Sequence, residues 1–171
     1  MRFTILAAEW NAKLVAVAKV MNSKVALPIY STFLLELKDG VLRITASDMD
    51  CSRCSTLPVM DMDRANEHNG SLCVTASFLL DSLKNLGDQP VTFEADEENL
   101  SVVIRYNNGQ FDMVGFPAKD YALPGTMGKS VQVTIEASVL NDSIGKSLYA
   151  VGNDDLRPIF SGIYFTKKGD E

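Results

Sequence analysis

The amino-acid sequence predicts an α+β protein in which helices cover one face of antiparallel sheets. Three observations carry this prediction. Residues 1–117 contain two successive segments that each consist of a strand, a helix and several short strands. The dipeptide Asp39-Gly40, a strong signal for a two-residue hairpin, interrupts the first run of strands. The opening pattern starts again at Val131, which indicates an internally duplicated architecture.

The first segment opens with RFTIL, a short apolar strand, and continues with AEWNAKLVAVAKVM, which has the apolar period of an amphipathic helix. Alternating runs between Ser31 and Val59 then predict antiparallel strands on both sides of the hairpin. The apolar stripe of the helix comprises Trp10, Leu14, Val17 and Met21.

The second segment repeats this order. SLCVTA is typical of a strand, and SFLLDSLKNLG is typical of a helix that ends at Gly87. Its apolar stripe comprises Leu79, Leu83 and Leu86. Residues 90–116 then contain three strand patterns separated by turn residues. The following stretch is rich in Pro, Gly and Ser and lacks periodicity, which indicates a domain boundary near residues 118–130.

Residues 131–171 match residues 1–41 without a gap, at a spacing of 130 positions. LPIYSTFLLELKDG corresponds to RPIFSGIYFTKKGD, VQVTIEA corresponds to the opening strand, and SVLNDSIGKSLYAV predicts a helix. The stripe of that helix comprises Leu140, Ile144, Leu148 and Val151. We therefore expect a complete first domain at 1–120, a linker at 121–130 and the start of a second domain at 131–171. So short a second domain buries a sheet face poorly, and we expect the chain to be a fragment of a longer protein.

Composition and charge restrict the class of protein. With 171 residues, of which 46% are apolar and 22% charged, the chain is predicted to be globular. It contains no apolar run long enough for a membrane span and no signal-peptide core, so we expect a cytoplasmic protein with its three cysteines as reduced thiols. The net charge of -6 argues against a uniformly basic nucleic-acid coat but leaves room for a local basic patch.

Several phrases, taken together and in order, resemble one family. MRFTILAAEW, KVALPIYSTFLLELKDGVLRITASDMD, VTASFLLDSLKNL, GQFDMVGFPAKDY and LRPIFSGIYF resemble the bacterial sliding clamp, the beta subunit of DNA polymerase III. The resemblance implies the DNA-clamp fold, three copies of one domain per subunit, and a homodimeric ring around double-stranded DNA with helices inside and sheets outside. It also implies a non-catalytic processivity factor without a cofactor, whose partners are the catalytic subunit of DNA polymerase III and the clamp loader.

Lysines on the predicted helices are candidate phosphate contacts, because phosphate contacts give affinity without sequence information. On a helical wheel, Lys19 and Lys146 lie nearly opposite the apolar stripes, Lys84 lies well off its stripe and Lys13 flanks one. Lys24 follows the first helix where the resembled family has a basic DNA-contacting residue. The alternative for each lysine is ordinary solvation of a polar helix face. Acidic residues on or beside these helices reduce the net positive charge of the surface that the lysines form. We therefore expect the binding to DNA to be weak and salt-dependent.

The resemblance also implies a contact that closes the ring. In the family, the edge of the first domain joins the third domain of the other subunit through apolar positions that correspond here to Leu86, Phe111 and Met113. Ser82 stands where a larger apolar residue is usual. The alternative for Phe111 and Met113 is an ordinary half-buried edge strand. Phe160 corresponds to a position in the family's partner-peptide cleft.

Enzyme and metal motifs are incomplete in the sequence. SIGKS resembles the end of a phosphate-binding loop, but Leu140 stands in place of the first glycine. Cys51 and Cys54 form a C-x-x-C without a second pair, and His68 is the single histidine. We therefore predict no catalytic residues and no metal site. Two alternatives remain: a stand-alone α+β protein-interaction module without DNA function, and an enzyme whose active site lies beyond Glu171.

Overall fold

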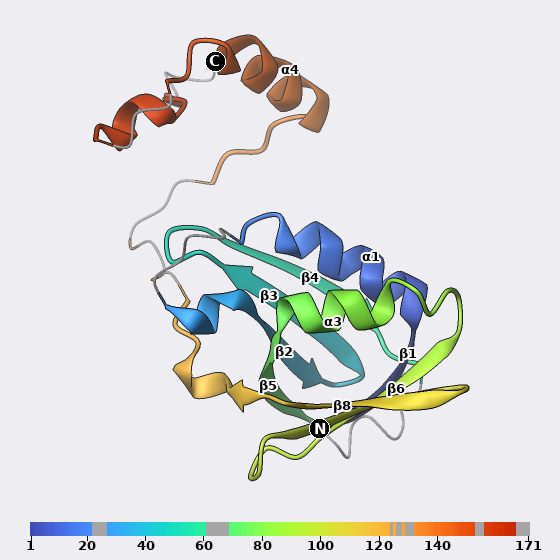
Figure 1. Ribbon diagram of the computed structural model, residues 1–171. Coiled ribbons are helices and arrows are strands. Elements are labelled where there is room, and N and C mark those ends of the chain that lie inside the picture. Colours follow the sequence, from blue (N-terminus) through green and yellow to red (C-terminus); the bar gives the residue numbers. More distant parts are fainter. Residues whose placement is uncertain are drawn as a thin grey trace. The chain divides into compact units, whose positions relative to one another are not determined.

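The computed structural model describes residues 1–21, 27–60, 69–123, 125, 128, 132–152 and 156–166. The chain divides into two compact units, Met1–Thr126 (unit 1) and Met127–Glu171 (unit 2). Figure 1 shows their helices and strands. Two residues singled out in the sequence, Lys24 and His68, lie outside the described residues.

Unit 1 contains every strand and helix that the sequence predicts for it. Between strands β2 and β3, Asp39 and Gly40 have φ angles of 51° and 72°, the left-handed values that a two-residue hairpin turn requires. The predicted hairpin is therefore confirmed. The elements are β1 (Arg2–Leu6), α1 (Ala7–Ala18), η1 (Pro28–Ser31), β2 (Thr32–Lys38), β3 (Val41–Ser47), β4 (Ser52–Pro58), β5 (Gly70–Thr75), α3 (Ala76–Leu83), β6 (Pro90–Ala95), β7 (Ser101–Tyr106), β8 (Gly109–Val114), β9 (Phe116–Pro117) and η3 (Ala118–Asp120), where η denotes a 3-10 helix.

The strands form two antiparallel sheets, with the orders β1-β6-β7-β8 and β4-β3-β2-β5-β9. The first strand of each half pairs within the sheet of the other half. β1 pairs with β6, with Phe3 opposite Phe93, and β5 pairs with β2, with Cys73 opposite Leu34. Because each sheet takes strands from both halves, the halves fold together as one domain.

Both sheets and the helices α1 and α3 share one hydrophobic core. The two helices are in contact and lie side by side in Figure 1. The ring of Phe3 stacks on that of Phe93, with centroids 4.9 Å apart, and both rings meet Trp10 edge-on. All three side chains are almost completely buried. This aromatic cluster fixes α1 against the four-stranded sheet.

The helices of unit 1 are shorter than the apolar stripes predicted from the sequence. Helix α1 ends at Ala18 and α3 ends at Leu83, so Met21 and Leu86 follow the helices and are only half-buried. Helix α3 therefore ends before Gly87, the end predicted from the sequence; Gly87, with a φ of 64°, belongs to the connection between α3 and β6. None of the described helices is long and apolar enough to cross a membrane.

The sequence does not predict β9, because two residues carry no periodicity. Phe116 pairs with Cys73 and Pro117 pairs with Leu72, so the chain crosses from one sheet to the other directly after β8. Gly115 permits this crossing: a Cβ atom there would lie 2.6 Å from Cδ2 of Leu72 and 2.9 Å from the carbonyl oxygen of Cys73. A side chain does not fit at that point without a shift of its neighbours.

Unit 2 contains α4 (Ala137–Leu148) and η4 (Pro158–Ser161), each 130 positions after its counterpart, α1 or η1. The predicted helix is confirmed, but the strand predicted at residues 131–137 is wrong. Residues 132–136 form no strand, and α4 begins at Ala137. Their counterpart β1 is held by β6, whereas the described part of unit 2 contains no strand with which they could pair.

The apolar stripe of α4 lacks the cover that α1 has. Leu140 and Ile144 are half-buried, whereas their counterparts Trp10 and Leu14 are fully buried. Leu148 is 58% exposed. Helix α4 therefore has the amphipathic pattern of α1 without a sheet beneath it among the described residues of unit 2.

Candidate functional site

Helix α1 exposes two of the candidate DNA-contacting lysines. Lys13 lies in the middle of the helix and Lys19 directly follows its last residue, where the partial negative charge of the helix end favours a cation. Neither side chain has an ion pair with another described residue. Both ammonium groups are therefore available to an anionic ligand. Lys24 lies outside the described residues, and its role stays a prediction.

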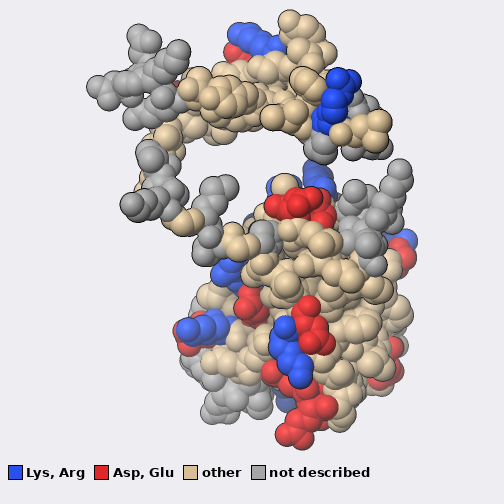
Figure 2. Space-filling view, turned by 90° about the vertical axis from the view of Figure 1, so that its left-hand side faces the viewer, with Lys and Arg blue, Asp and Glu red and all other residues tan. Residues whose placement is uncertain are grey.

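The lysines of the other two helices are paired with carboxylates. Nζ of Lys84 lies 2.6 Å from Oδ1 of Asp81 on α3, and Nζ of Lys146 lies 2.7 Å from Oδ2 of Asp142 on α4. All four side chains are more than half exposed, so each pair contributes little stability. Figure 2 shows a similar mixture on one face of the molecule, where basic and acidic side chains are interspersed. The four described candidate lysines thus fall into two classes.

A groove between α3 and β8 brings together three of the four residues predicted at the ring-closing contact. Ser82, Leu86 and Phe111 line this groove, whose volume is about 550 Å³. The short side chain of Ser82 contributes to the hollow. The other residues that line the groove are Ser77, Phe78, Asp81 and Asn85.

Phe78 belongs to this surface, although the apolar stripe predicted for the helix does not include it. Its side chain is 40% exposed and lines the groove, so an apolar ring lies at this surface. The signal was present in the spacing: Phe78 and Ser82 are four residues apart and share one side of α3, and Leu86 follows four positions later, after the helix ends. The groove therefore has an apolar lining that the stripe of buried leucines does not reveal.

Strand β8 is the edge of the four-stranded sheet, and β7 is its neighbour on the inner side. Phe111 is half-buried, and its ring stacks on that of Tyr106 with centroids 4.9 Å apart. Met113 lies opposite Val102, packs against the core and is not among the residues that line the groove. An edge strand presents backbone N–H and C=O groups to a partner. The groove and the outer edge of β8 thus form one continuous candidate contact surface.

Phe160 lies in η4 of unit 2 and is 56% exposed. The guanidinium carbon of Arg157 is 5.0 Å from the centroid of its ring, within the range of a cation–π contact. The backbone N–H of Gly152 donates a hydrogen bond to the carbonyl oxygen of Phe160 at 2.9 Å. The ring is held in place yet remains accessible, and its role in a partner-peptide cleft stays a prediction.

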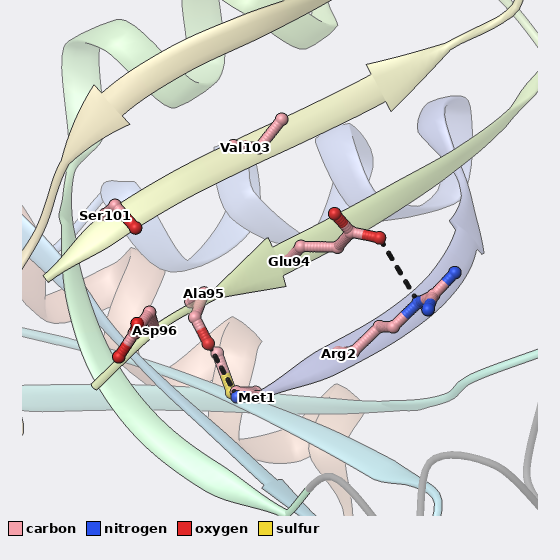
Figure 3. Close-up of a pocket in the computed structure, with 7 residues that line it drawn as sticks. All are labelled: Met1, Arg2, Glu94, Ala95, Asp96, Ser101 and Val103. Carbon is pink, nitrogen blue, oxygen red and sulfur yellow. Dashed lines mark hydrogen bonds and ion pairs between the residues drawn. The ribbon is translucent and has the colours of Figure 1, made fainter. Parts of the chain in front are cut away.

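A second hollow, of about 430 Å³, lies over β1, β6 and β7 (Figure 3). The α-amino group of Met1 donates a hydrogen bond to the carbonyl oxygen of Ala95 at 2.7 Å. Nε of Arg2 lies 3.3 Å from one oxygen of Glu94, and Nε of Arg105 lies 3.4 Å from the other. These charged groups pair with one another across neighbouring strands. The arrangement ties the strands together and does not resemble an acid–base or nucleophilic centre.

Two buried groups of unit 1, the Cys73 thiol and the Tyr121 hydroxyl, have raised pKa values. Burial raises the pKa of the Cys73 thiol and of the Tyr121 hydroxyl to about 12. Both groups are therefore protonated at neutral pH. Cys51 and Cys54 are exposed free thiols. In the part of the chain that the structure describes, no three His, Cys, Asp or Glu side chains are placed to hold a metal ion.

Comparison with known proteins matches the chain to one family. The profile of the DNA polymerase III beta subunit, N-terminal domain, matches residues 1–124. The chain is 26% identical over 166 residues to the beta sliding clamp of Bacillus subtilis (strain 168), an alignment that covers 95% of this chain and 44% of that protein. It is 26% identical over 172 residues to the beta sliding clamp of Vibrio cholerae, with 99% and 45% covered. The chain thus spans less than half the length of these relatives.

Solved structures share the fold. The DNA polymerase III subunit beta from Pseudomonas aeruginosa matches with a TM-score of 0.83 at 24% identity, over 95% of this chain and 42% of that chain. A putative DNA polymerase III beta subunit from Eubacterium rectale matches with a TM-score of 0.81 at 16% identity, over 94% and 42%. The α+β clamp fold expected from the sequence is therefore confirmed. Because the family profile covers most of the chain and the fold agrees with it, the chain belongs to the DNA polymerase III beta subunit family.

Proposed function

We propose that the chain is part of a sliding clamp, a ring that encircles double-stranded DNA and tethers the replicative polymerase without catalysing a reaction itself. One observation carries this proposal: α1 exposes Lys13 and Lys19 without an acidic partner among the described residues. Phosphate groups are alike along a duplex, so two ammonium groups on a helix bind DNA without reading its sequence. Such contacts permit movement along the duplex.

Topology, and not affinity, holds the protein on DNA in this mechanism. Two unpaired lysines give weak and salt-dependent binding. Lys84 and Lys146 contribute less, because each must first release the carboxylate that lies 2.6 or 2.7 Å away. The lysines of α1 therefore dominate the interaction with phosphate, and the closed ring supplies the processivity.

We propose that the groove between α3 and β8 closes the ring against a second copy of the full-length subunit, which makes the ring a homodimer. Leu86 and Phe111 offer apolar contact area, and the outer edge of β8 offers backbone groups for strand pairing. Met113, two residues after Phe111 in β8, packs against the hydrophobic core. Phe111→Asp in the full-length subunit is expected to convert dimer to monomer in sedimentation experiments, whereas Asp112→Asn on the same strand leaves it dimeric. A Phe111→Asp dimer of normal stability would exclude this surface.

Phe160 is proposed to contribute to the site at which the catalytic subunit of DNA polymerase III and the clamp loader bind, in the cytoplasm. Its exposed ring suits an apolar anchor residue of a partner peptide. The contact with Arg157 supports this role, because it fixes the orientation of the ring before a peptide arrives.

Binding to duplex DNA at several salt concentrations tests the DNA contact. We expect the logarithm of the affinity to fall linearly with the logarithm of the salt concentration, and each lysine–phosphate contact to account for about 0.9 of the slope. The double substitution Lys13→Gln, Lys19→Gln should therefore make the slope shallower by about 2. The matched control is Lys38→Gln, an exposed lysine at the end of β2.

Two results would contradict the proposal. An unchanged slope in the double variant would show that the α1 lysines do not contact phosphate. Absence of any salt-dependent binding would favour the stand-alone interaction module over a DNA-encircling protein.

A further inference from the structure

The segment of residues 117–123, which follows β8 and Gly115, covers the face of the five-stranded sheet opposite the main core. Leu34 and Cys73 point to this face, because Phe33 and Val74 next to them in β2 and β5 point into the main core. The segment begins at β9 and continues through η3. A second, small cluster of buried residues lies beneath it.

Tyr121 anchors this segment. It is 6% exposed, whereas the residues on either side of it, Asp120 and Ala122, are exposed. Its ring meets the ring of Tyr30 edge-on, with centroids 5.5 Å apart, in a pocket that Leu34 and Cys73 complete. The hydroxyl of Tyr30 donates a hydrogen bond to the carbonyl oxygen of Ala122 at 2.9 Å. One buried aromatic side chain with a backbone hydrogen bond beside it is a common way for a peptide to dock on a protein.

The internal repeat contains a counterpart of Tyr30 that is not buried. Phe160 stands 130 positions after Tyr30, and both lie in 3-10 helices that begin with proline, η4 and η1. Tyr30 is 5% exposed and Phe160 is 56% exposed. At Tyr30, residues 117–123 pack against strands β2 and β5, whereas the described part of unit 2 holds neither a strand nor such a segment beside Phe160.

We propose that residues 117–123 are a built-in ligand of unit 1: Tyr121 occupies an aromatic site formed by Tyr30, Leu34 and Cys73, and thereby closes it to other partners. The site accepts a short peptide segment with a tyrosine as its anchor. Since the segment leads from β9 towards the second repeat, the occupied site also fixes the start of the connection between the repeats to unit 1.

Trypsin cleavage after Lys119, in η3, reports whether the segment is seated, because a seated 3-10 helix must open before a protease can cut it. Tyr121→Ala should accelerate this cleavage by about 10-fold or more. The matched control is Tyr164→Ala, a tyrosine of unit 2 that is 88% exposed, which should leave the rate unchanged. Cleavage after Lys13, in α1, reports unfolding of the whole unit and serves as the reference rate.

A milder variant keeps the test valid if Tyr121→Ala unfolds unit 1. Tyr30→Phe keeps the ring pair and removes the hydroxyl that donates to Ala122, so cleavage after Lys119 should rise by about 2- to 5-fold relative to cleavage after Lys13. If neither Tyr121→Ala nor Tyr30→Phe changes this ratio, Tyr121 does not hold the segment and the proposal is overturned.

A labelled synthetic peptide with the sequence of residues 117–123 tests the site as a binding site. It should bind the Tyr121→Ala chain saturably and leave the wild-type chain unbound, and the peptide with the same Tyr121→Ala change should bind neither. Equal binding to both chains would mean that the segment does not occupy the site. Lack of saturable binding to the Tyr121→Ala chain would mean that no such site exists; either result overturns the proposal. Neither assay contains DNA, so failure here is separate from failure of the proposed clamp function.

Discussion

Nζ of Lys84 lies 2.6 Å from Oδ1 of Asp81, three residues earlier on α3. Lys146 has an equivalent acidic neighbour on α4, whereas Lys13 and Lys19 on α1 have none among the described residues. Each helix carries a lysine away from its apolar stripe, yet the helices differ in the positive charge that they offer to a polyanion.

Asp81→Asn is expected to strengthen binding to duplex DNA. Asparagine has a similar shape but no charge, so Lys84 becomes free to neutralise a phosphate, and the salt-dependence slope should become steeper by about 0.9. The free energy of unfolding should change by less than about 1 kcal/mol, because the pair is exposed. DNA titrations at several salt concentrations and urea unfolding measure the two quantities. Asp88→Asn, an exposed acid just after α3, is the control; an equal effect there would point to net charge and not to the local pair.

Phe93→Ala is expected to lower the free energy of unfolding by about 3–5 kcal/mol, because the ring contacts both Phe3 and Trp10 in the centre of the core. Trp10 is the single tryptophan, so its fluorescence reports the same cluster during a urea titration. Phe165→Ala, at a site that is 61% exposed, should change the value by less than about 0.5 kcal/mol. Similar small effects of both substitutions would contradict the described packing.

Gly115→Ala is expected to destabilise unit 1 by about 1–3 kcal/mol, because the added methyl group overlaps Leu72 and the backbone of Cys73. Thermal unfolding followed by circular dichroism measures the destabilisation. Gly125→Ala is the matched control, since a Cβ atom there meets nothing within 4 Å. A Gly115→Ala protein as stable as this control would show that the crossing from β8 to β9 has more room than the structure indicates.

The free energy of unfolding is expected to fall as the pH rises above about 9. The Cys73 thiol has an ordinary pKa of 9.0, which burial raises to about 12 in the folded protein. The unfolded chain therefore loses its proton first, so the stabilisation is complete below pH 9.0 and declines as the pH approaches 12. Tyr121 acts in the same direction between 10.0 and about 12.

Urea unfolding at about pH 8 and about pH 10.5 measures this decline. Cys73→Ala should reduce it, whereas Cys54→Ala, which removes an exposed thiol, should not. The same decline in both variants would assign it to groups other than Cys73.

Local sequence patterns were sufficient to predict the helices and the hairpin. An α-helix satisfies its hydrogen bonds within one segment, so the apolar periods of α1, α3 and α4 are visible in the sequence. The turn between β2 and β3 requires two left-handed residues, and Asp39-Gly40 supplies them. The spacing of 130 positions between the repeats likewise predicted a second helix, which α4 confirms.

The candidate site could be predicted only in part. Resemblance to a family indicated Ser82, Leu86 and Phe111, and the structure brings them to one groove. The wheel positions of Lys13 and Lys84 suggested one role for both. Whether a lysine is free or paired depends on the acidic side chains that reach it. Only the three-dimensional arrangement shows that Lys84 is paired and that Lys13 has no acidic partner among the described residues.

The sequence by itself determined which segments are helical, where the chain turns and that the opening pattern is used twice. Only the tertiary structure decided the exchange of β1 and β5 between the two sheets, the added strand β9, the burial of Tyr121 beside Tyr30, and the lack of a strand at residues 132–136. The physical reason is the same in each case. A strand or a buried anchor gains its hydrogen bonds and its cover from residues distant in the chain, so its own sequence cannot tell whether that partner is present.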